Sequence, residues 1–315
     1  ALHLARQGWN IAVHCHHSRT EAEQTAQEIR ALGRKAEVFC CDLADEVAVR
    51  ALLPAVNAAM GTVDCVVNNA SLFSEDHAHS FSYAMLNQHM HANLGAPLLL
   101  AQALHAQLPE GQQGSVINLL DQKLFNLNPD FLSYTLSKAA LQTATVMLAQ
   151  ALAPKIRVVG VAPGITMVSG HQTEADFAAA HQVTPLGRSS TPQDIARTVA
   201  FVADSPAMTG TTLLVDGGQH LAAATSDRHR TRTAPGIYRG RCIRRKGRGA
   251  WHGHHGRGAR CVDGNNADLR SRPGSPANTR TRTYQTSDVP ITHHIVSRCA
   301  RIRGTAAAVR STDLR

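Results

Sequence analysis

Short apolar runs alternate with helical patterns along the first 220 residues, and this alternation restricts the possible fold more than any other feature. Each run has the length of a buried strand, as Val116 to Leu120 illustrates. The runs cover residues 11–13, 36–41, 64–67, 115–120, 156–161 and 211–215. Helical patterns cover residues 21–32, 47–60 and 83–108 and a segment around Tyr134. A further helical segment is expected to begin at Thr191 as its cap, with Pro192 and Asp194 in its first turn. Strands and helices at this spacing predict a Rossmann-type, doubly wound parallel α/β sheet.

The first residues of the chain have the pattern of a helix end. Arg6 falls in the last turn and Gly8 supplies a stop signal. A Rossmann-type sheet has its first strand at the centre, followed by a glycine-rich turn and a helix N-terminus that binds pyrophosphate. We therefore expect an N-terminally truncated sheet without that strand and turn. A true start further upstream is favoured over a chain that folds and binds its cofactor poorly.

Charge divides the chain into two parts. Residues 1–220 carry 12 Lys+Arg against 18 Asp+Glu, whereas residues 221–315 carry 20 against 5. The acidic first part argues against nucleic acid as its partner. The Arg-rich part has no helical or strand periodicity and too little apolar surface to offset its ordering entropy. We predict one folded domain at 1–222 and an irregular basic tail at 223–315, either disordered or read from a shifted frame, with a nucleic-acid-binding arm as the alternative.

The cysteines and histidines predict neither disulfides nor a metal site. Four of the seven cysteines lie in or beside apolar runs: Cys15, Cys40, Cys41 and Cys65. Without a CxxC pair, buried thiols in a reducing cytosol are the favoured interpretation. His77, His79, His89 and His91 have no third ligand at metal spacing and are expected to be scattered surface residues. Since neither a signal peptide nor a long apolar run occurs, we expect a cytoplasmic protein without a membrane partner.

The segment from Ser115 to Leu141 carries the chemistry. Asp121 follows the apolar run, and Tyr134 and Lys138 are four residues apart, which places them on one helical face. A nearby ammonium is expected to lower the pKa of the phenol, which would make Tyr134 a usable proton donor. Ligands of such sheets bind beyond the carboxyl ends of the strands, where Asp121 would stand. The alternative is a chance Tyr/Lys spacing on a solvated helix.

Five motifs in the first 220 residues resemble those of the short-chain dehydrogenase/reductases. They are Asn68-Asn69-Ala70, Asn93, the Tyr134-to-Lys138 motif, Pro163-Gly164 and Asp216-Gly217-Gly218. Two departures resemble one branch, the pteridine reductases and bacterial dihydromonapterin reductases. Residues 68–73 read NNASLF, and Asp121 stands where most of the family has a catalytic serine. The runs at residues 14–18, 93–97 and 216–220 are similar to the same branch.

This resemblance implies a dinucleotide cofactor. No acid that would hold a ribose 2′-hydroxyl occurs between His14 and Thr20, and the donors and positive charge there favour NADPH over a plain solvated turn. Its expected contacts after the first two strands are His16, His17, Ser18, Asp42 and Leu43. Its other expected contacts are Asn69, Ala70, Ser71, Tyr134, Lys138, Pro163 and Gly164.

The expected reaction is reduction of a dihydropterin to a tetrahydropterin, with a hydride from NADPH and a proton from Tyr134. Asp121 would contact the pterin and assist protonation, Phe73 would stack on the ring, and Asn93 would join a proton relay with Lys138. Residues 165–187 would cover the substrate. An ordinary loop anchor remains open for Phe73, as does a helix-packing amide for Asn93.

The resemblance also implies a homotetramer. Two other functions remain open. One is a carbonyl or 3-oxoacyl-thioester reductase of the same family, from which Asp121 in place of serine departs. The other is an inactive fragment or binding protein whose basic tail binds nucleic acid.

Overall fold

The computed structural model describes residues 1–168, 173–182, 184–221 and 293–298. Within these residues the strands form one sheet in the order β2-β1-β7-β3-β4-β5-β6. The strands are β1 (Trp9–Cys15), β2 (Ala36–Cys40), β3 (Cys65–Asn68), β4 (Gly114–Leu119), β5 (Ile156–Pro163), β6 (Thr212–Val215) and β7 (His293–Arg298). All neighbouring pairs are parallel except the two that involve β7. The predicted Rossmann-type α/β fold is confirmed.

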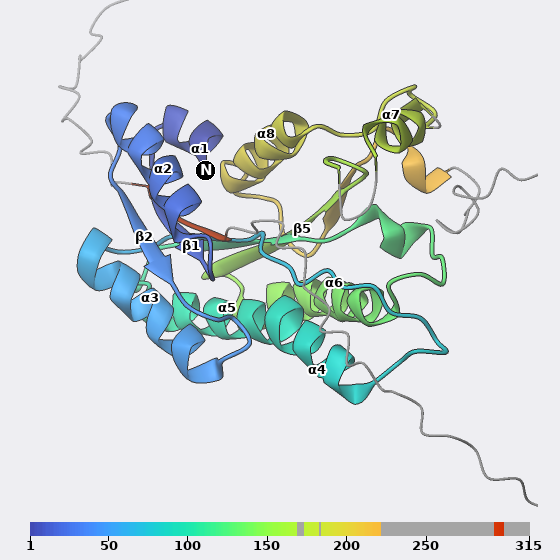
Figure 1. The fold of residues 1–315 in the computed structure, drawn as a ribbon. Coiled ribbons are helices and arrows are strands. Elements are labelled where there is room, and N and C mark those ends of the chain that lie inside the picture. Colours follow the sequence, from blue (N-terminus) through green and yellow to red (C-terminus); the bar gives the residue numbers. More distant parts are fainter. Residues whose placement is uncertain (169–172, 183, 222–292, 299–315) are drawn as a thin grey trace, which may run out of the picture. The chain divides into compact units, whose positions relative to one another are not determined.

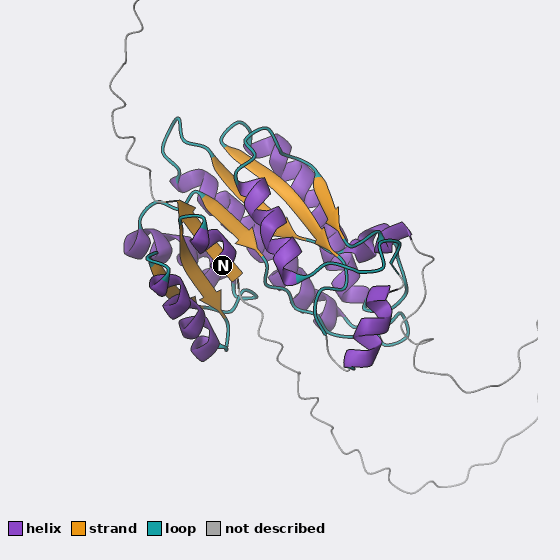
Figure 2. Cartoon of the chain, turned by 90° about the horizontal axis from the view of Figure 1, so that it is seen from above, coloured by secondary structure: helices purple, strands orange, loops and turns teal. Residues whose placement is uncertain are grey.

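Helices cover both faces of the sheet (Figure 1). On one face lie α1 (Leu2–Arg6), α2 (Arg19–Ala31) and α8 (Pro192–Ala203). On the other face lie α3 (Glu46–Met60), α5 (Ala96–Gln107) and α6 (Leu132–Leu152). The remaining helical elements are α4 (Tyr83–Met90), α7 (Glu174–Gln182), the π-turn η1 (His91–Gly95) and the short 3-10 turns η2 (Gln122–Phe125) and η3 (Gln219–Leu221). Figure 2 shows the same elements from above, with strands in orange and helices in purple.

Two buried clusters hold these layers together. The first joins Ile11 and Ile117 of the sheet to Ile29 of α2 and Val202 of α8. The second joins the opposite face of the sheet to α3 and α5, and Leu53 and Leu104 are fully buried in it. Burial of apolar side chains on both faces stabilises the sheet and explains why its strands read as continuous apolar runs.

Strand β7 lies inside the sheet, between β1 and β3. It runs antiparallel between β1 and β3, with Ile11 opposite Val296 and Val67 opposite His294. The structure therefore differs at these residues from our expectation of a tail without regular structure. Buried backbone groups of β1 and β3 need partners, and the β-branched Ile295 and Val296 suit a strand. Residues 222–292 and 299–315 lie outside the described part, so the division at residue 222 stays a prediction.

The expected long helix at residues 83–108 is interrupted. It consists of α4 and α5 joined by the π-turn η1, which contains Asn93. The predicted cap of α8 is confirmed, because Thr191 and Asp194 form a reciprocal capping box. Within the described residues, no helix combines the length and the apolar character that crossing a membrane requires.

Candidate active site

Asp121 and Tyr134 meet beyond the carboxyl end of β4. Asp121 follows the strand and caps η2, where its Oδ1 accepts a hydrogen bond from the Lys123 N–H at 2.8 Å. The Tyr134 hydroxyl, in the first turn of α6, donates to Asp121 Oδ2 at 2.7 Å. Tyr134 is buried, and the hydrogen bond joins it directly to Asp121.

Lys138 lies one turn along α6 and is also buried. Its Nζ donates to the Leu119 carbonyl oxygen at 2.7 Å and lies 5.9 Å from the centre of the Tyr134 ring. Burial lowers the pKa of this ammonium to about 8, although the Asp121 charge acts in the opposite direction. Lys138 is therefore still charged at neutral pH.

The expected fall in the pKa of Tyr134 is wrong. Burial raises this pKa well above its ordinary value, and the charge of Asp121 and its hydrogen bond add to the effect. Burial also raises the pKa of the Asp121 carboxyl, against the opposing hydrogen bonds from Lys123 and Tyr134 and the charge of Lys138. The phenol thus keeps its proton, as a proton donor must.

Asn93 projects from the π-turn between α4 and α5. Its Oδ1 accepts from the Leu72 N–H at 2.7 Å, and its Nδ2 donates to the Leu72 carbonyl at 2.9 Å and to Ser137 Oγ at 3.0 Å. The side chain therefore ties the loop after β3 to α6 beside Lys138. The π-turn holds one residue more than a turn of α-helix, and this directs the Asn93 amide inward. The turn therefore explains why asparagine, which suits a regular helix poorly, stands at this position.

Phe73 lies over Tyr134, with ring centres 4.7 Å apart and planes at 86°. Its other contact is a stack on Phe131 at 4.3 Å and 12°. Phe131 was not predicted. It precedes α6 with φ of 55°, a left-handed conformation that is uncommon for a bulky residue. No local sequence signal marks such a backbone angle.

Two further side chains, Asp76 and His89, fix the loop that follows β3 and carries Phe73. Neither of them was identified from the sequence as part of the site. The buried Asp76 accepts hydrogen bonds from Ser133 N at 2.9 Å and Ser133 Oγ at 2.5 Å, which anchors the start of α6. His89 is fully buried, so its expected place on the surface is wrong. Its Nδ1 bonds to the Met85 carbonyl, and its Nε2 accepts from the Ser74 N–H. Burial lowers the pKa of His89, which favours the neutral ring needed for these roles.

The proposed cofactor residues His16, His17 and Ser18 form the turn between β1 and α2. Ser18 is the N-cap residue of α2, and no side-chain capping bond from it occurs among the described residues. His16 Nε2 lies 3.9 Å from Asp42 Oδ2 of the turn after β2. Leu43 follows as a buried side chain. These residues gather at the carboxyl ends of β1 and β2.

The other proposed cofactor residues follow β3 and β5. Asn69, Ala70 and Ser71 continue directly from β3, and the Asn69 N–H bonds to the Val67 carbonyl. Pro163 ends β5, and Gly164 follows it. A Cβ on Gly164 would lie 2.4 Å from Ser189 Oγ and 2.8 Å from Asp216 Cα, so only glycine fits there. The expected cover at 165–187 includes residues 169–172 and 183, which lie outside the described residues.

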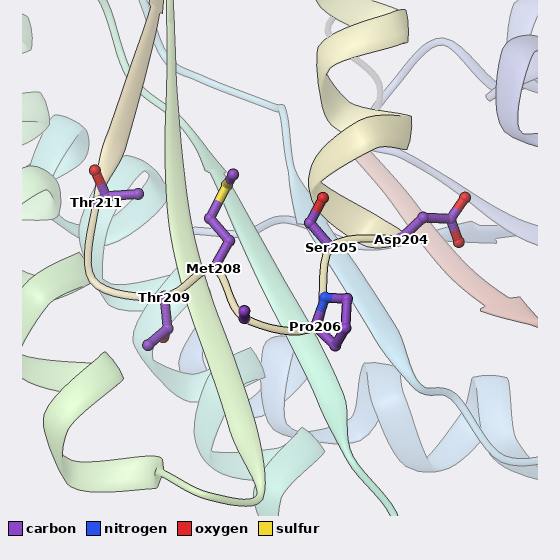
Figure 3. Close-up of a pocket in the computed structure, with 7 residues that line it drawn as sticks. Asp204, Ser205, Pro206, Met208, Thr209 and Thr211 are labelled. Carbon is purple, nitrogen blue, oxygen red and sulfur yellow. The ribbon is translucent and has the colours of Figure 1, made fainter.

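A surface hollow of about 480 Å³ lies away from these groups (Figure 3). It is lined by Asp204, Ser205, Pro206, Ala207, Met208, Thr209 and Thr211. This segment precedes β6, whereas Asp121 and Tyr134 lie beyond the carboxyl end of β4. The hollow is therefore separate from the candidate active site. No group of three or more His, Cys, Asp or Glu that could hold a metal occurs in the described part.

Comparisons with known proteins find similar reductases and oxidoreductases. A family model described as enoyl-(acyl carrier protein) reductase matches residues 1–220. The structure of FolM alternative dihydrofolate reductase 1 from Brucella canis, complexed with NADP, is 41% identical, with a TM-score of 0.68 over 71% of this chain and 89% of that chain. A 3-oxoacyl-(acyl-carrier-protein) reductase from Staphylococcus aureus is 30% identical over 226 residues, 70% of this chain and 92% of that protein. An uncharacterized oxidoreductase from Methylorubrum extorquens is 33% identical over 68% of this chain and 89% of that protein.

Proposed function

This chain belongs to the short-chain dehydrogenase/reductase family of oxidoreductases, and we propose that it reduces a dihydropterin to a tetrahydropterin with NADPH. The observation that carries the proposal is the 2.7 Å hydrogen bond from Tyr134 to Asp121. A serine would supply one hydroxyl at this position, whereas a carboxyl group can engage the donor–acceptor edge of a pterin. We further propose a homotetramer, on the family resemblance alone, and a cytoplasmic location, on the cysteine pattern of the sequence.

The aromatic side chains beside this pair also support a flat substrate. Phe73 is 42% exposed although it stacks on Phe131 and makes a T-shaped contact with the Tyr134 ring. A partly exposed aromatic side chain next to the proton donor suits contact with a planar heterocycle. The relative named as an alternative dihydrofolate reductase is 41% identical, and dihydrofolate contains a pterin ring.

The described residues fit both ends of NADPH. The turn after β1 offers hydrogen-bond donors and positive charge, which suit a 2′-phosphate. These groups belong to His16, His17, Ser18 and Arg19. The Ser18 hydroxyl has no capping bond within the described part of the chain and can donate to the phosphate. At the other end, the Lys138 ammonium carries three donors, of which one binds the Leu119 carbonyl oxygen and the others would serve ribose hydroxyls. Asn69, Ala70, Ser71, Pro163 and Gly164 would line the remaining surface.

The cofactor supplies a hydride when it is bound, and the residues of this chain position the substrate and move the proton. Tyr134 donates its proton to the reduced ring nitrogen. The charge of Lys138 stabilises the phenolate that remains. Asp121 orients the phenol and binds the pterin edge. Asn93 and Asp76 keep the Phe73 loop and the start of α6 in register with these groups.

Steady-state kinetics with matched substrates test the proposal. The protein should oxidise NADPH with a dihydropterin and much more slowly with a 3-oxoacyl thioester. Asp121→Ser should reduce the rate with the dihydropterin most. Turnover of the thioester alone, or an equal loss on both substrates, would refute the assignment.

A 3-oxoacyl-thioester reductase is the second candidate. The relative from Staphylococcus aureus, a 3-oxoacyl-(acyl-carrier-protein) reductase, favours it. The replacement of the usual serine by Asp121 argues against it.

A third possibility is an inactive binding protein with a nucleic-acid-binding tail. Such a protein would show salt-dependent RNA binding that requires residues 221–315, together with no NADPH binding.

A further inference from the structure

Two cysteines face each other across the first two strands of the sheet. Cys15 ends β1 and Cys40 ends β2, and they are direct partners in the parallel register. Their sulfur atoms lie 2.8 Å apart. A disulfide needs a sulfur–sulfur distance of about 2.05 Å, so the sulfurs need approach only about 0.8 Å further. The backbone is already aligned, because the Cys41 N–H bonds to the Cys15 carbonyl.

The two thiols differ in access to solvent. Cys40 is exposed, and Cys15 is completely buried. Burial raises the pKa of the Cys15 thiol to about 12, and its contacts with Cys40 add to this effect. Burial likewise raises the pKa of the neighbouring Cys41 to about 11. Cys40 is therefore the sulfur that an oxidant in solution reaches first, and Cys15 is placed to resolve the product.

Arg19 connects this pair to the turn that would hold the 2′-phosphate. Its guanidinium donates to Cys40 Sγ at 3.8 Å, and it follows Ser18 in the chain. A guanidinium beside the sulfur stabilises negative charge on an attacking thiolate. A 2′-phosphate bound at this turn would engage the guanidinium and place its own negative charge near the sulfur.

We propose that Cys15 and Cys40 form a reversible disulfide and that the 2′-phosphate of a bound dinucleotide slows its formation. The first part stands on the thiol geometry alone. The second part rests on the proposed NADPH function. It gives the cofactor turn a second role, in which an occupied site protects the dithiol from oxidation.

The reaction balances with a disulfide oxidant such as oxidised glutathione. The Cys40 thiolate attacks one glutathione sulfur, forms a mixed disulfide and expels one glutathione thiolate. The Cys15 thiol then gives its proton to the solvent and attacks Cys40 Sγ, which expels the second glutathione thiolate, and both expelled thiolates take up a proton from the solvent. Two cysteine thiols are thereby oxidised by two electrons, and one glutathione disulfide is reduced to two glutathione molecules.

Peptide mapping tests the disulfide directly. The full chain is treated with oxidised glutathione, its remaining thiols are alkylated, and it is digested with trypsin. Peptide 7–19 should be recovered joined to peptide 36–50, and a thiol reductant should release both. The matched variants separate the neighbours: Cys41→Ser should keep the link and Cys40→Ser should lose it. A link that survives in Cys40→Ser, or a stable glutathione adduct without a link, would overturn the proposal.

The rate of link formation tests the role of the phosphate. Saturating NADP⁺ should slow the reaction several-fold, and NAD⁺, which lacks the 2′-phosphate, should slow it less. Arg19→Gln should slow the reaction without nucleotide and reduce the difference between the two nucleotides. Equal protection by both nucleotides would overturn the second part. Absence of NADP⁺ binding would refute that part and the cofactor assignment but would leave the disulfide result standing.

Discussion

Replacement of Asp121 by Asn tests how the carboxyl group acts on both Tyr134 and Lys138. Asn has nearly the same shape, but it has a single acceptor oxygen. Asp121 accepts from the Lys123 N–H through one oxygen and from the Tyr134 hydroxyl through the other. The variant therefore loses one of these hydrogen bonds and the negative charge, while the packing around the site stays almost unchanged.

The expected loss of rate follows from these contacts. A hydrogen bond to a charged group contributes about 1.5–3 kcal/mol, and a positioned general acid accelerates reactions about 10²–10⁴-fold. We therefore expect kcat for the dihydropterin to fall about 100-fold, which corresponds to about 2.7 kcal/mol. The affinity for NADPH should not change, because the cofactor contacts proposed above do not include Asp121.

The pH profile supplies a second, independent readout. The rate should fall as the pH rises through about 8, because the Lys138 ammonium has a pKa of about 8 and loses its charge there. The Asp121 charge raises this pKa, so Asp121→Asn should lower it further. The alkaline limb of kcat, measured by NADPH absorbance, should then move to lower pH.

Asp130→Asn is the matched control. Asp130 is a buried carboxylate in the same segment between β4 and α6, and its Oδ1 lies 3.8 Å from His77 Nδ1. This change should leave the alkaline limb where it is in the unmodified protein. An Asp121→Asn variant with an unchanged or upward-shifted limb would refute the coupling between Asp121 and Lys138, whatever its kcat.

Three stability predictions follow, two from the N-terminal turn of α8 and one from a glycine. Thr191→Ala should lower the free energy of unfolding by about 1 kcal/mol in urea titrations, because the cap is lost. The pKa of Asp194 is lowered to about 2, chiefly by its hydrogen bond from Arg188. The stability that the ionised carboxylate contributes above pH 3.8 should therefore disappear as the pH falls through 2. A free energy of unfolding that stays constant over this pH range would contradict the prediction. Gly217→Ala should cost more than about 3 kcal/mol, because φ is +64° and the new Cβ would lie within van der Waals overlap of the Arg188 carbonyl. Gly33→Ala, with a similar φ and open space, should cost only about 1 kcal/mol, and equal losses would show that the overlap is relieved.

The arrangement of Asp121, Tyr134 and Lys138 was predictable because local rules determine it. A parallel strand ends at the ligand-binding edge of its sheet, and residues four apart share a helix face. The pKa of Tyr134 could not be predicted in the same way. Its direction depends on burial of the phenol in the folded chain, and the charge and hydrogen bond of Asp121 raise the pKa further.

Other features depend on contacts between distant segments. Asp76 bonds to Ser133, 57 residues away, and no periodicity links the two. The left-handed Phe131 depends on the same junction between the loop and α6. Strand β7 is the extreme case, since it pairs with β1 from the opposite end of the chain. A short apolar segment in a basic, irregular sequence gives no indication of which strands it will join.

The two halves of the proposed site are therefore supported differently. The groups around Tyr134 come from β4, α6 and the loop after β3, and they hold one another through Asp76, Asn93 and Lys138. The turn at residues 16–18 is placed by β1, which in the described part of the sheet reaches β3 only through β7. Contacts of the helices with both halves supply the remaining support. Perturbation of residues 293–298 should consequently affect the cofactor turn and the nearby Cys15–Cys40 pair before it affects the environment of Tyr134.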